Sequence, residues 1–388
     1  MTQQHRLEPL FRSDALQSFH ELLSQIQAFD PVYRRFIRVR LVIDACMVQR
    51  ELRWRLGGRQ KPNARSSMQE AIDAGTLVLF APTWLGREIE KHGADLAADT
   101  GVSEQRVLEE WHSFAGCIHF YEPNVGNTLQ KHTAHVDPDD LPYKLVREQL
   151  GAHAIYSADA DFDAMGEPRV NLNIDLLCRD YARAASIEVG ITLGSGFTLT
   201  VSLEMVVTFV KFCIQAFRRL PPVARVLIVS AVALFLAHPV SRRRLVVLVR
   251  STWSQLKQPS SPVRKILAEV ARQFVAAQQD ASRSAAAIRA TLPPPKRPSA
   301  LALARSICLV NRAPLSLPEI ERRMRIEGYV SRSPYFTKYL QRLLRADGRF
   351  REVSPGSWVI STEGDRIAIF GGRDMTTPRS DRMVAGAS

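Results

Sequence analysis

The sequence predicts an α/β protein whose first domain is built on a mostly parallel sheet. Two observations carry this prediction. Between residues 38 and 162, four short apolar runs alternate with segments of helical periodicity, which is the pattern of parallel strands joined by helices. Beyond residue 180 the alternation ends, and hairpin-like, apolar, alanine-rich and basic segments follow one another. The length of 388 residues is sufficient for two or three domains.

Four apolar runs define the predicted sheet. Each is short and rich in β-branched or aromatic residues, which favours a buried strand. In chain order they are RVRLVIDACMV (38–48), TLVLFAP (76–82), CIHFYEP (117–123) and AHAIYSADADF (152–162). The sheet domain is therefore predicted to span residues 38–180. Residues 1–37 precede it as an N-terminal helical segment, with Asp14 placed to cap a helix over residues 14–29.

The middle of the chain, residues 186–258, is predicted to form a β-hairpin followed by a hydrophobic helical region. Apolar residues alternate with polar ones over residues 186–204, around a Gly-Ser-Gly sequence. Residues 223–240 are nearly all apolar, at the lower limit of the ~20 residues that cross a membrane. Arginines flank this segment on both sides, without the asymmetry typical of a membrane span. We therefore favour a helix buried in the core or in a homo-oligomer, and keep contact of residues 223–250 with an anionic membrane surface as the alternative.

The remaining third of the chain is predicted to hold four kinds of segment. An alanine-rich pattern over residues 263–291 predicts a long helix, and the proline-rich residues 292–299 predict a stiff linker. Residues 300–362 carry helical and strand patterns of their own and are predicted to fold as a domain. Residues 371–388 are predicted to be a disordered tail.

The domain at residues 300–362 has the pattern of two or three helices followed by a hairpin around a Ser-Pro-Gly turn. Together with the run G-Y-x-S-x-S…F…Y-L…D-x-R-F…G-x-W, this pattern resembles a winged helix, in particular the HARE-type helix-turn-helix family. The second helix carries Lys338, Arg342 and Arg345 on its predicted exposed side. The resemblance implies that these side chains contact nucleic-acid phosphates. A protein-docking winged helix with a solvated basic face is the alternative.

Charge is divided unequally along the chain. The net formal charge is +13, but residues 1–180 carry −6 and residues 181–388 carry +19. Such a basic excess suggests a polyanionic partner, either nucleic acid or an anionic membrane. Five widely separated cysteines without a C-x-x-C pair predict reduced thiols, and the N-terminal sequence MTQQHRLEPLFRSD lacks the apolar region of a secretory signal. We therefore expect a cytoplasmic protein, with membrane association as the alternative.

Acidic residues stand where the predicted strands end. Asp44 closes the first strand, and Glu88 lies on the helix after the second. Asp140 precedes a later helix, and Asp159 and Asp161 follow the fourth strand. The carboxyl ends of parallel strands form the functional crevice of such sheets, so these side chains are expected to converge. Oxygen ligands without His or Cys favour Mg²⁺ or Mn²⁺, and two such ions can activate water for phosphodiester hydrolysis.

Residues 38–165 contain four motifs in a fixed order, namely LVIDACMV, APTWLGREIEKH, DPDDLPYKLVREQLGA and YSADADF. In these motifs the region resembles the PIN domain family of metal-dependent nucleases. The resemblance places Ser157 at a small hydroxyl position, and it departs from the family at Ala45 and Cys46, where Asn, Ser or Thr is frequent. It implies a catalytic, metal-holding set of four acids with an auxiliary fifth, which are Asp44, Glu88, Asp140, Asp159 and, as the auxiliary acid, Asp161.

The resulting hypothesis is a Mg²⁺- or Mn²⁺-dependent PIN-type endoribonuclease. By resemblance, it hydrolyses RNA phosphodiester bonds through a water activated by carboxylate-bound ions and leaves 5′-phosphate and 3′-hydroxyl ends. DNA is the alternative substrate. A non-catalytic nucleic-acid-binding or membrane-tethered regulatory protein is the alternative function. A toxin-like RNase also fits the first domain, although the long appendage counts against it. Taken singly, each acid is more often a helix cap or a solvated charge than a metal ligand.

Overall fold

The computed structural model describes residues 36–58, 64–124, 137–171, 173–187, 262–294, 297–311, 313–331 and 333–361. Contacts divide the chain into a smaller unit, Met1–Arg12 with Arg183–Arg283, and a larger one, Ser13–Ala182 with Ser284–Ser388. Several predicted segments lie outside the described residues: the helix over 14–29, the apolar segment 223–240 and the tail 371–388. Of the predicted hairpin, residues 186 and 187 are instead helical, because a helix that begins at residue 174 continues through them, and the rest is not described.

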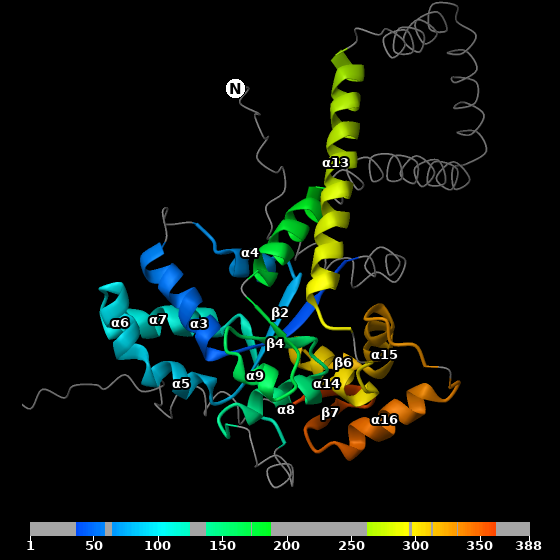
Figure 1. The fold of residues 1–388 in the computed structure, drawn as a ribbon. Helices are drawn as coiled ribbons and strands as arrows, with labels where there is room; N and C mark the ends of the chain where they lie inside the picture. The colour runs from blue at the N-terminus through cyan, green and yellow to red at the C-terminus, as the bar shows by residue number, and fades with distance from the viewer. Residues whose placement is uncertain are drawn as a thin grey trace, which may run out of the picture. The chain divides into compact units, whose positions relative to one another are not determined.

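A five-stranded parallel sheet forms the centre of the larger unit (Figure 1). Its strand order is β3-β2-β1-β4-β5, so β1 lies between β2 and β4. The strands are β1 (Val39–Ile43), β2 (Leu77–Pro82), β3 (Ile118–Tyr121), β4 (Ala154–Tyr156) and β5 (Arg169–Val170). The predicted parallel sheet is thus confirmed, and β1 to β4 fall within the four apolar runs. The prediction missed β5, because two residues are too short to show a strand pattern.

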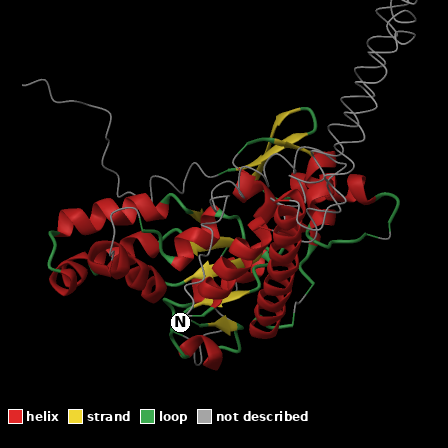
Figure 2. Cartoon of the chain, turned by 90° about the horizontal axis from the view of Figure 1, so that it is seen from above, coloured by secondary structure: helices red, strands yellow, loops and turns green. Residues whose placement is uncertain are grey.

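The central strands are buried on both faces. Every residue of β1 and β2 is buried, and Leu41, Val42 and Phe80 have no exposed surface. Continuous burial requires side chains that fit on both sides of the sheet, which is why these strands read as unbroken apolar runs. Figure 2 shows helices on either side of the strands. One charged residue, Arg40, lies within β1 and is only 6% exposed.

Helices connect the strands and have recognisable start and stop signals. Ser66 and Ser103 accept hydrogen bonds from Gln69 N and Arg106 N, capping the helices that follow them. Gly101 and Gly151 end helices with positive φ, a conformation that glycine adopts without strain. The helices of the sheet region (residues 36–182) are α3 (Ala45–Arg53), α4 (Ser67–Asp73), α5 (Leu85–Lys91), α6 (Gly93–Thr100), α7 (Glu104–Ala115), α8 (Leu141–Leu150) and α9 (Asp161–Ala164), with the π-helical turn η2 (Trp54–Gly58) after α3.

The C-terminal region (residues 297–361) combines three helices with a small antiparallel sheet of order β6-β8-β7. Trp358 of β8 is 2% exposed, and Ile320, Leu340 and Leu344 have no exposed surface, so this region has its own core. Gly356 has a φ of +77° in the turn between the last two strands. The elements are α14 (Ala300–Asn311), β6 (Leu315–Ser316), α15 (Leu317–Ile326), α16 (Phe336–Ala346), β7 (Phe350–Ser354) and β8 (Ser357–Ile360).

The C-terminal region packs against the sheet region within the larger unit. Helix α14 contacts α8. The guanidinium of Arg349 lies 4.6 Å from the centre of the Tyr121 ring and also donates to the Tyr121 hydroxyl. At the end of α8, a Cβ on Gly151 would stand 2.7 Å from Cβ of Pro298. These contacts join segments that are far apart in the sequence.

Helix α13 (Pro262–Thr291) begins in the smaller unit and ends in the larger. It occupies most of the alanine-rich segment. Within the described ranges of the chain, no helix combines the length and apolar character needed to cross a membrane.

Candidate functional site

The sheet brings Asp44 and Ser157 side by side at the carboxyl ends of two neighbouring strands. Ile43 of β1 is paired with Tyr156 of β4, so the residues that follow both strands leave the sheet at the same edge. Ser157 Oγ donates to Oδ2 of Asp44 at 2.7 Å, across 113 positions of sequence. The predicted convergence of residues after the first and fourth strands is therefore present in the fold.

Asp44 is 8% exposed and is held by three donors. Its Oδ1 accepts from Ala45 N at 2.7 Å, and this bond caps α3. Its Oδ2 accepts from Ser157 Oγ and, at 2.9 Å, from the thiol of Cys46. Asp44 therefore caps α3 through Oδ1. Its other oxygen, Oδ2, is fixed by Ser157 and Cys46, and the helix-cap alternative does not account for these bonds.

Cys46 occupies the position at which the sequence departs from the PIN pattern. Burial, followed by the negative charge of Asp44, raises the pKa of this thiol to about 11. The sulfur therefore stays protonated at neutral pH and donates a hydrogen bond to Asp44. In this position the thiol orients the carboxylate as a hydroxyl or amide would.

Asp159 and Asp161 continue the hydrogen-bonded chain that starts at Asp44. Asp159 N donates to Ser157 Oγ at 2.8 Å, and Asp161 N donates to Oδ1 of Asp159 at 2.9 Å. Both aspartates are exposed. Ser157 therefore connects the buried carboxylate of Asp44 to the loop that carries the two exposed ones.

Glu88 is positioned by a residue that the sequence analysis did not identify. The hydroxyl of Tyr143, from α8, donates to Oε2 of Glu88 at 2.8 Å. Tyr143 is itself 2% exposed, so this donor is fixed by packing. Burial raises the pKa of Glu88, and the charges of Asp44 and Asp139 raise it further. No sequence pattern indicates this contact, because Glu88 and Tyr143 are 55 positions apart in the chain.

Asp140 precedes α8, but its side chain makes no capping hydrogen bond. The helix-cap alternative for this residue is therefore not supported by the geometry, and the solvated charge stays as its structural alternative. Partial burial raises the pKa of the Asp140 carboxyl to about 7, and nearby carboxylates add to the shift. The largest of these charge contributions come, in order, from Asp44, Asp137, Asp159 and Asp161. The fold has thus placed acids of three motifs where their negative charges oppose the ionisation of Asp140.

The chemistry of this donor set fits a hard divalent cation. All side chains in the cluster offer carboxylate oxygens, the ligands that Mg²⁺ and Mn²⁺ prefer. A cation would also offset the repulsion that raises the pKa of Asp140. As the described side chains stand, however, no group of three or more His, Cys, Asp or Glu is arranged to hold a metal ion. Side-chain rotation of the exposed Asp159 and Asp161 would therefore accompany binding.

The three basic residues predicted to contact nucleic acid lie on one exposed face of α16. Lys338, Arg342 and Arg345 are exposed, and the opposite face of the helix is buried through Phe336, Leu340 and Leu344. Arg345 also faces Glu352 of β7 at 3.6 Å.

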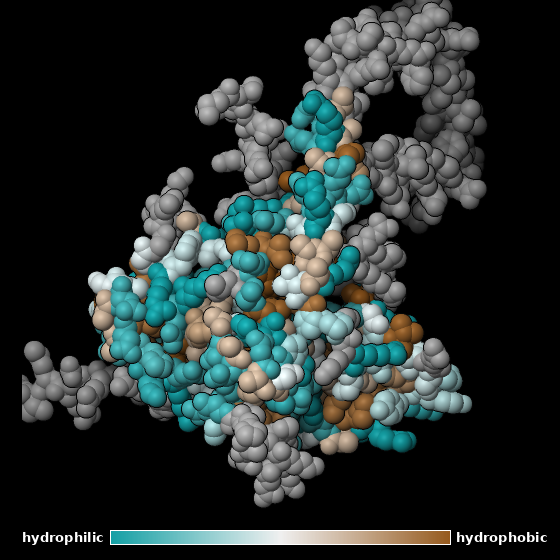
Figure 3. All heavy atoms as spheres, in the orientation of Figure 1, coloured by the Kyte–Doolittle hydropathy of each residue, from teal (hydrophilic) through white to brown (hydrophobic). Residues whose placement is uncertain are grey.

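Two tyrosines extend the exposed face of α16, and the sequence analysis did not identify them. Tyr335 is 68% exposed and Tyr339 is 50% exposed, and their spacing of four places them one turn apart. Figure 3 shows hydrophobic patches within a largely hydrophilic surface over the C-terminal region. Aromatic residues interleaved with basic ones on a helix could have been recognised in the sequence as a stacking surface.

Comparison of the chain with protein-family models, curated proteins and solved structures found no match. The carboxylates of the sheet region and the basic face of α16 are therefore the features that bear on function.

Proposed function

We propose that this protein is a Mg²⁺- or Mn²⁺-dependent nuclease of the PIN type that hydrolyses phosphodiester bonds in RNA. One observation carries the proposal: carboxylates from separate motifs gather at the carboxyl edge of a parallel sheet, where burial and then their negative charges raise the pKa of Asp140 to about 7. Carboxylates that repel one another at the carboxyl edge of such a sheet are typical of a functional site that binds a divalent cation.

Each side chain of the cluster has a distinct part in this proposal. The ion or ions would be held by the five predicted acids, Asp44, Glu88, Asp140, Asp159 and Asp161. A bound divalent cation lowers the pKa of water and stabilises negative charge on phosphoryl oxygens. Ser157 and Cys46 orient Asp44, and Tyr143 orients Glu88, so these three are positioning residues.

The C-terminal region, which we assign to the winged-helix type, would hold the RNA. Residues 1–180 carry a net charge of −6, so the sheet region by itself repels a polyanion. The exposed Lys338, Arg342 and Arg345 provide phosphate contacts, and Tyr335 and Tyr339 provide surfaces on which unpaired bases can stack. The two regions thus divide hydrolysis and binding between them.

A non-catalytic RNA-binding protein is the second candidate. The observation that favours it is the absence, among the described side chains, of a ready-made group of three metal ligands. The two candidates can be told apart by direct measurement. Only the nuclease would cleave RNA, and its cleavage would depend on the metal and on the acids. A DNA substrate or a toxin-like RNase would share the same metal-dependent chemistry.

The experiment compares the wild-type chain with Asp140→Asn on labelled RNA and on single-stranded DNA, with Mn²⁺ or with EDTA. Asp140 is the sharpest choice because its carboxyl makes no capping bond, so Asn leaves the hydrogen bonds of α8 in place. We expect cleavage of RNA that EDTA abolishes and that Asp140→Asn reduces at least about 100-fold. The same substitution at Asp99, an exposed residue of α6 that is paired with Arg53, should leave the rate unchanged.

Two results would contradict the nuclease. Binding of RNA without cleavage at any metal concentration, by a folded protein, would favour the non-catalytic candidate. Cleavage that survives both EDTA and the Asp44→Asn/Asp140→Asn double substitution would show that hydrolysis arises elsewhere or from a contaminant.

A further inference from the structure

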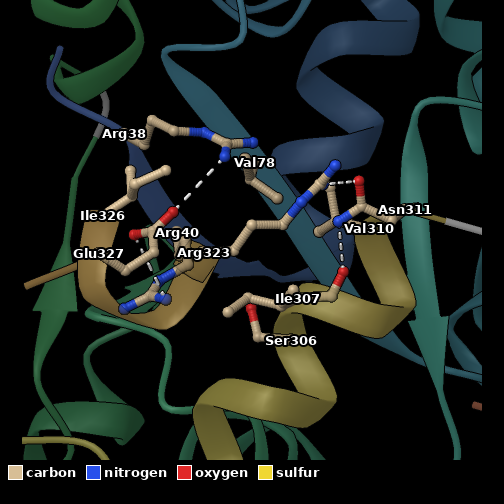
Figure 4. A pocket seen from close by; sticks show the side chains of 10 residues that line it. All are labelled: Arg38, Arg40, Val78, Ser306, Ile307, Val310, Asn311, Arg323, Ile326 and Glu327. Carbon is tan, nitrogen blue, oxygen red and sulfur yellow. Dashed lines mark hydrogen bonds and ion pairs between the residues drawn. The ribbon is translucent and has the colours of Figure 1, made fainter. Parts of the chain in front are cut away.

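A pocket lies at the opposite edge of the parallel sheet from the carboxylates. It has a cavity volume of about 30 Å³ and is open to solvent on one side. Arg38 and Arg40, at the start of β1, contribute from the sheet region, whereas Ser306, Arg323 and Glu327 contribute from the C-terminal region (Figure 4). This volume suits one small polar group, and the rest of a larger ligand would lie outside the pocket. The pocket is thus built jointly by two segments almost three hundred positions apart.

Positive charge is in excess in this pocket. Three guanidinium groups line it, and a single lining carboxylate, that of Glu327, lies between two of them. Glu327 Oε1 is 3.4 Å from Arg38 Nη1, and Glu327 Oε2 is 3.6 Å from Arg40 Nη1. Arg323 is held by Glu319 at 2.6 Å and by the side-chain oxygen of Asn311. The lining residues therefore carry two more positive charges than negative ones.

Arg40 is the most unusual member of this group. It is only 6% exposed, and neither its Nε nor its Nη1 has a hydrogen-bond acceptor among the described residues. Its distance of 3.6 Å from Glu327 gives charge compensation but no hydrogen bond. Buried guanidinium N–H groups without acceptors are costly, and structures normally supply a partner for them. An anion in the pocket would be such a partner.

We propose that this pocket binds the phosphate group of a small phosphorylated molecule, with Arg40 as the buried anchor. The planar fork of a guanidinium matches two phosphate oxygens, and the excess of two positive charges matches a phosphate dianion. Apolar side chains of β2, α14 and α15 complete the lining and would contact the part of the ligand next to the phosphate. The depth of Arg40 favours a small molecule over a nucleic-acid strand, whose backbone is better matched by the exposed face of α16.

Binding at this place would hold the two regions together. Arg38 and Arg40 belong to the sheet region, and Arg323 and Asn311 belong to the C-terminal region. A ligand that binds only the folded arrangement raises the unfolding temperature in proportion to its occupancy. The pocket therefore has a readout that does not depend on hydrolytic activity.

The test measures thermal unfolding and calorimetric binding of the full-length chain with inorganic phosphate and with AMP, at constant ionic strength. We expect a saturable rise in unfolding temperature. A response to phosphate alone identifies the free ion as the ligand, and a stronger response to AMP identifies a nucleotide. Arg323→Gln and, separately, Arg38→Gln should weaken binding about tenfold, as expected for the loss of a charged hydrogen bond.

Two control variants make the result specific. Arg325→Gln lies on the same helix as Arg323, but its side chain is 61% exposed and outside the pocket, so it should bind like wild type. Asp140→Asn should also bind like wild type, because its carboxyl belongs to the opposite edge of the sheet. No saturable response to either compound would overturn the proposal, and so would an equal loss of binding in Arg323→Gln and Arg325→Gln.

Discussion

At the scale of single residues, burial and hydrogen bonds together decide the protonation state of His153. The backbone of Arg40 donates to Nδ1 of His153 at 3.0 Å, and His153 N donates back to the carbonyl of Arg40 at 2.8 Å. Burial, assisted by the positive charge of Arg40, lowers the pKa of His153 to about 4. Nδ1 accepts a hydrogen bond and must therefore be unprotonated, so the neutral imidazole is part of the folded structure.

We expect mild acid to destabilise the protein through His153. Its pKa in the folded state, about 4, lies below the ordinary value of about 6.5. As the pH falls, the unfolded chain therefore binds the proton first. The contribution to stability is complete above about pH 6.5 and is lost progressively down to about pH 4, with about 2 kcal/mol lost by pH 5.

Urea unfolding at pH 7.5 and at pH 5 measures this effect. His153→Gln keeps an acceptor for Arg40 N but removes the proton-binding site, so this variant should lose about 2 kcal/mol less between the two pH values. His112→Gln, at an exposed position of α7, is the matched control. An identical pH dependence in wild type and in His153→Gln would contradict the assignment.

At the scale of single elements, α16 shows how one helix can serve both folding and binding. Phe336, Leu340 and Leu344 recur at intervals of four and bury one face in the C-terminal region. The remaining face presents basic and aromatic side chains, among them Lys338 and Tyr339. Substitutions on the exposed face can therefore change binding without loss of the core.

Lys338→Gln and Arg342→Gln should each weaken RNA binding and lower the slope of log affinity against log salt by about 1. The physical reason is the loss of one phosphate contact with its released counterion. Fluorescence anisotropy with single-stranded RNA at several salt concentrations measures both quantities. Arg106→Gln, an exposed position of α7, should leave the slope unchanged. An unchanged slope in the α16 variants would favour the protein-docking alternative.

At the scale of the whole described molecule, the C-terminal region and the sheet region share a packed interface within the larger unit. Gly151 ends α8 with a φ of +62°, and Gly101 ends α6 with a φ of +69°. The two positions therefore impose the same backbone strain on any other residue. They differ in their surroundings, because a Cβ at 151 would meet Pro298, whereas a Cβ at 101 would have no atom within 4 Å.

Gly151→Ala should therefore be more destabilising than Gly101→Ala. Both variants incur about 1–2 kcal/mol of left-handed strain, and only the first adds the overpacking cost of about 1–3 kcal/mol. Thermal unfolding measures the difference, and limited proteolysis should cleave Gly151→Ala faster within residues 292–299. Equal unfolding temperatures would show that the packing of Pro298 on α8 contributes little to stability.

Local patterns were sufficient to predict much of the fold and most of the candidate site. The four apolar runs predicted β1 to β4, because burial on both faces leaves a continuous hydrophobic signal. The carboxyl ends of parallel strands lie at one edge of the sheet, so the acids that follow the strands were predicted to lie close together. The short β5, the Tyr143 donor to Glu88 and the tyrosines of α16 were missed. Strand β5 is too short to give a periodic pattern. The hydrogen bond from Tyr143 to Glu88 joins residues that are 55 positions apart in the chain.

By itself, the sequence determined the α/β class, the order of the elements and the placement of the acids at strand ends, because all three follow from short-range periodicity and chain direction. Only the tertiary structure decided that Ser157 and Cys46 fix Asp44, that Asp140 makes no capping bond, and that Arg38 and Arg40 face Glu327 across one pocket. The physical reason is that hydrogen bonds and charge interactions act over a few ångströms in space, whatever the separation of the partners along the chain.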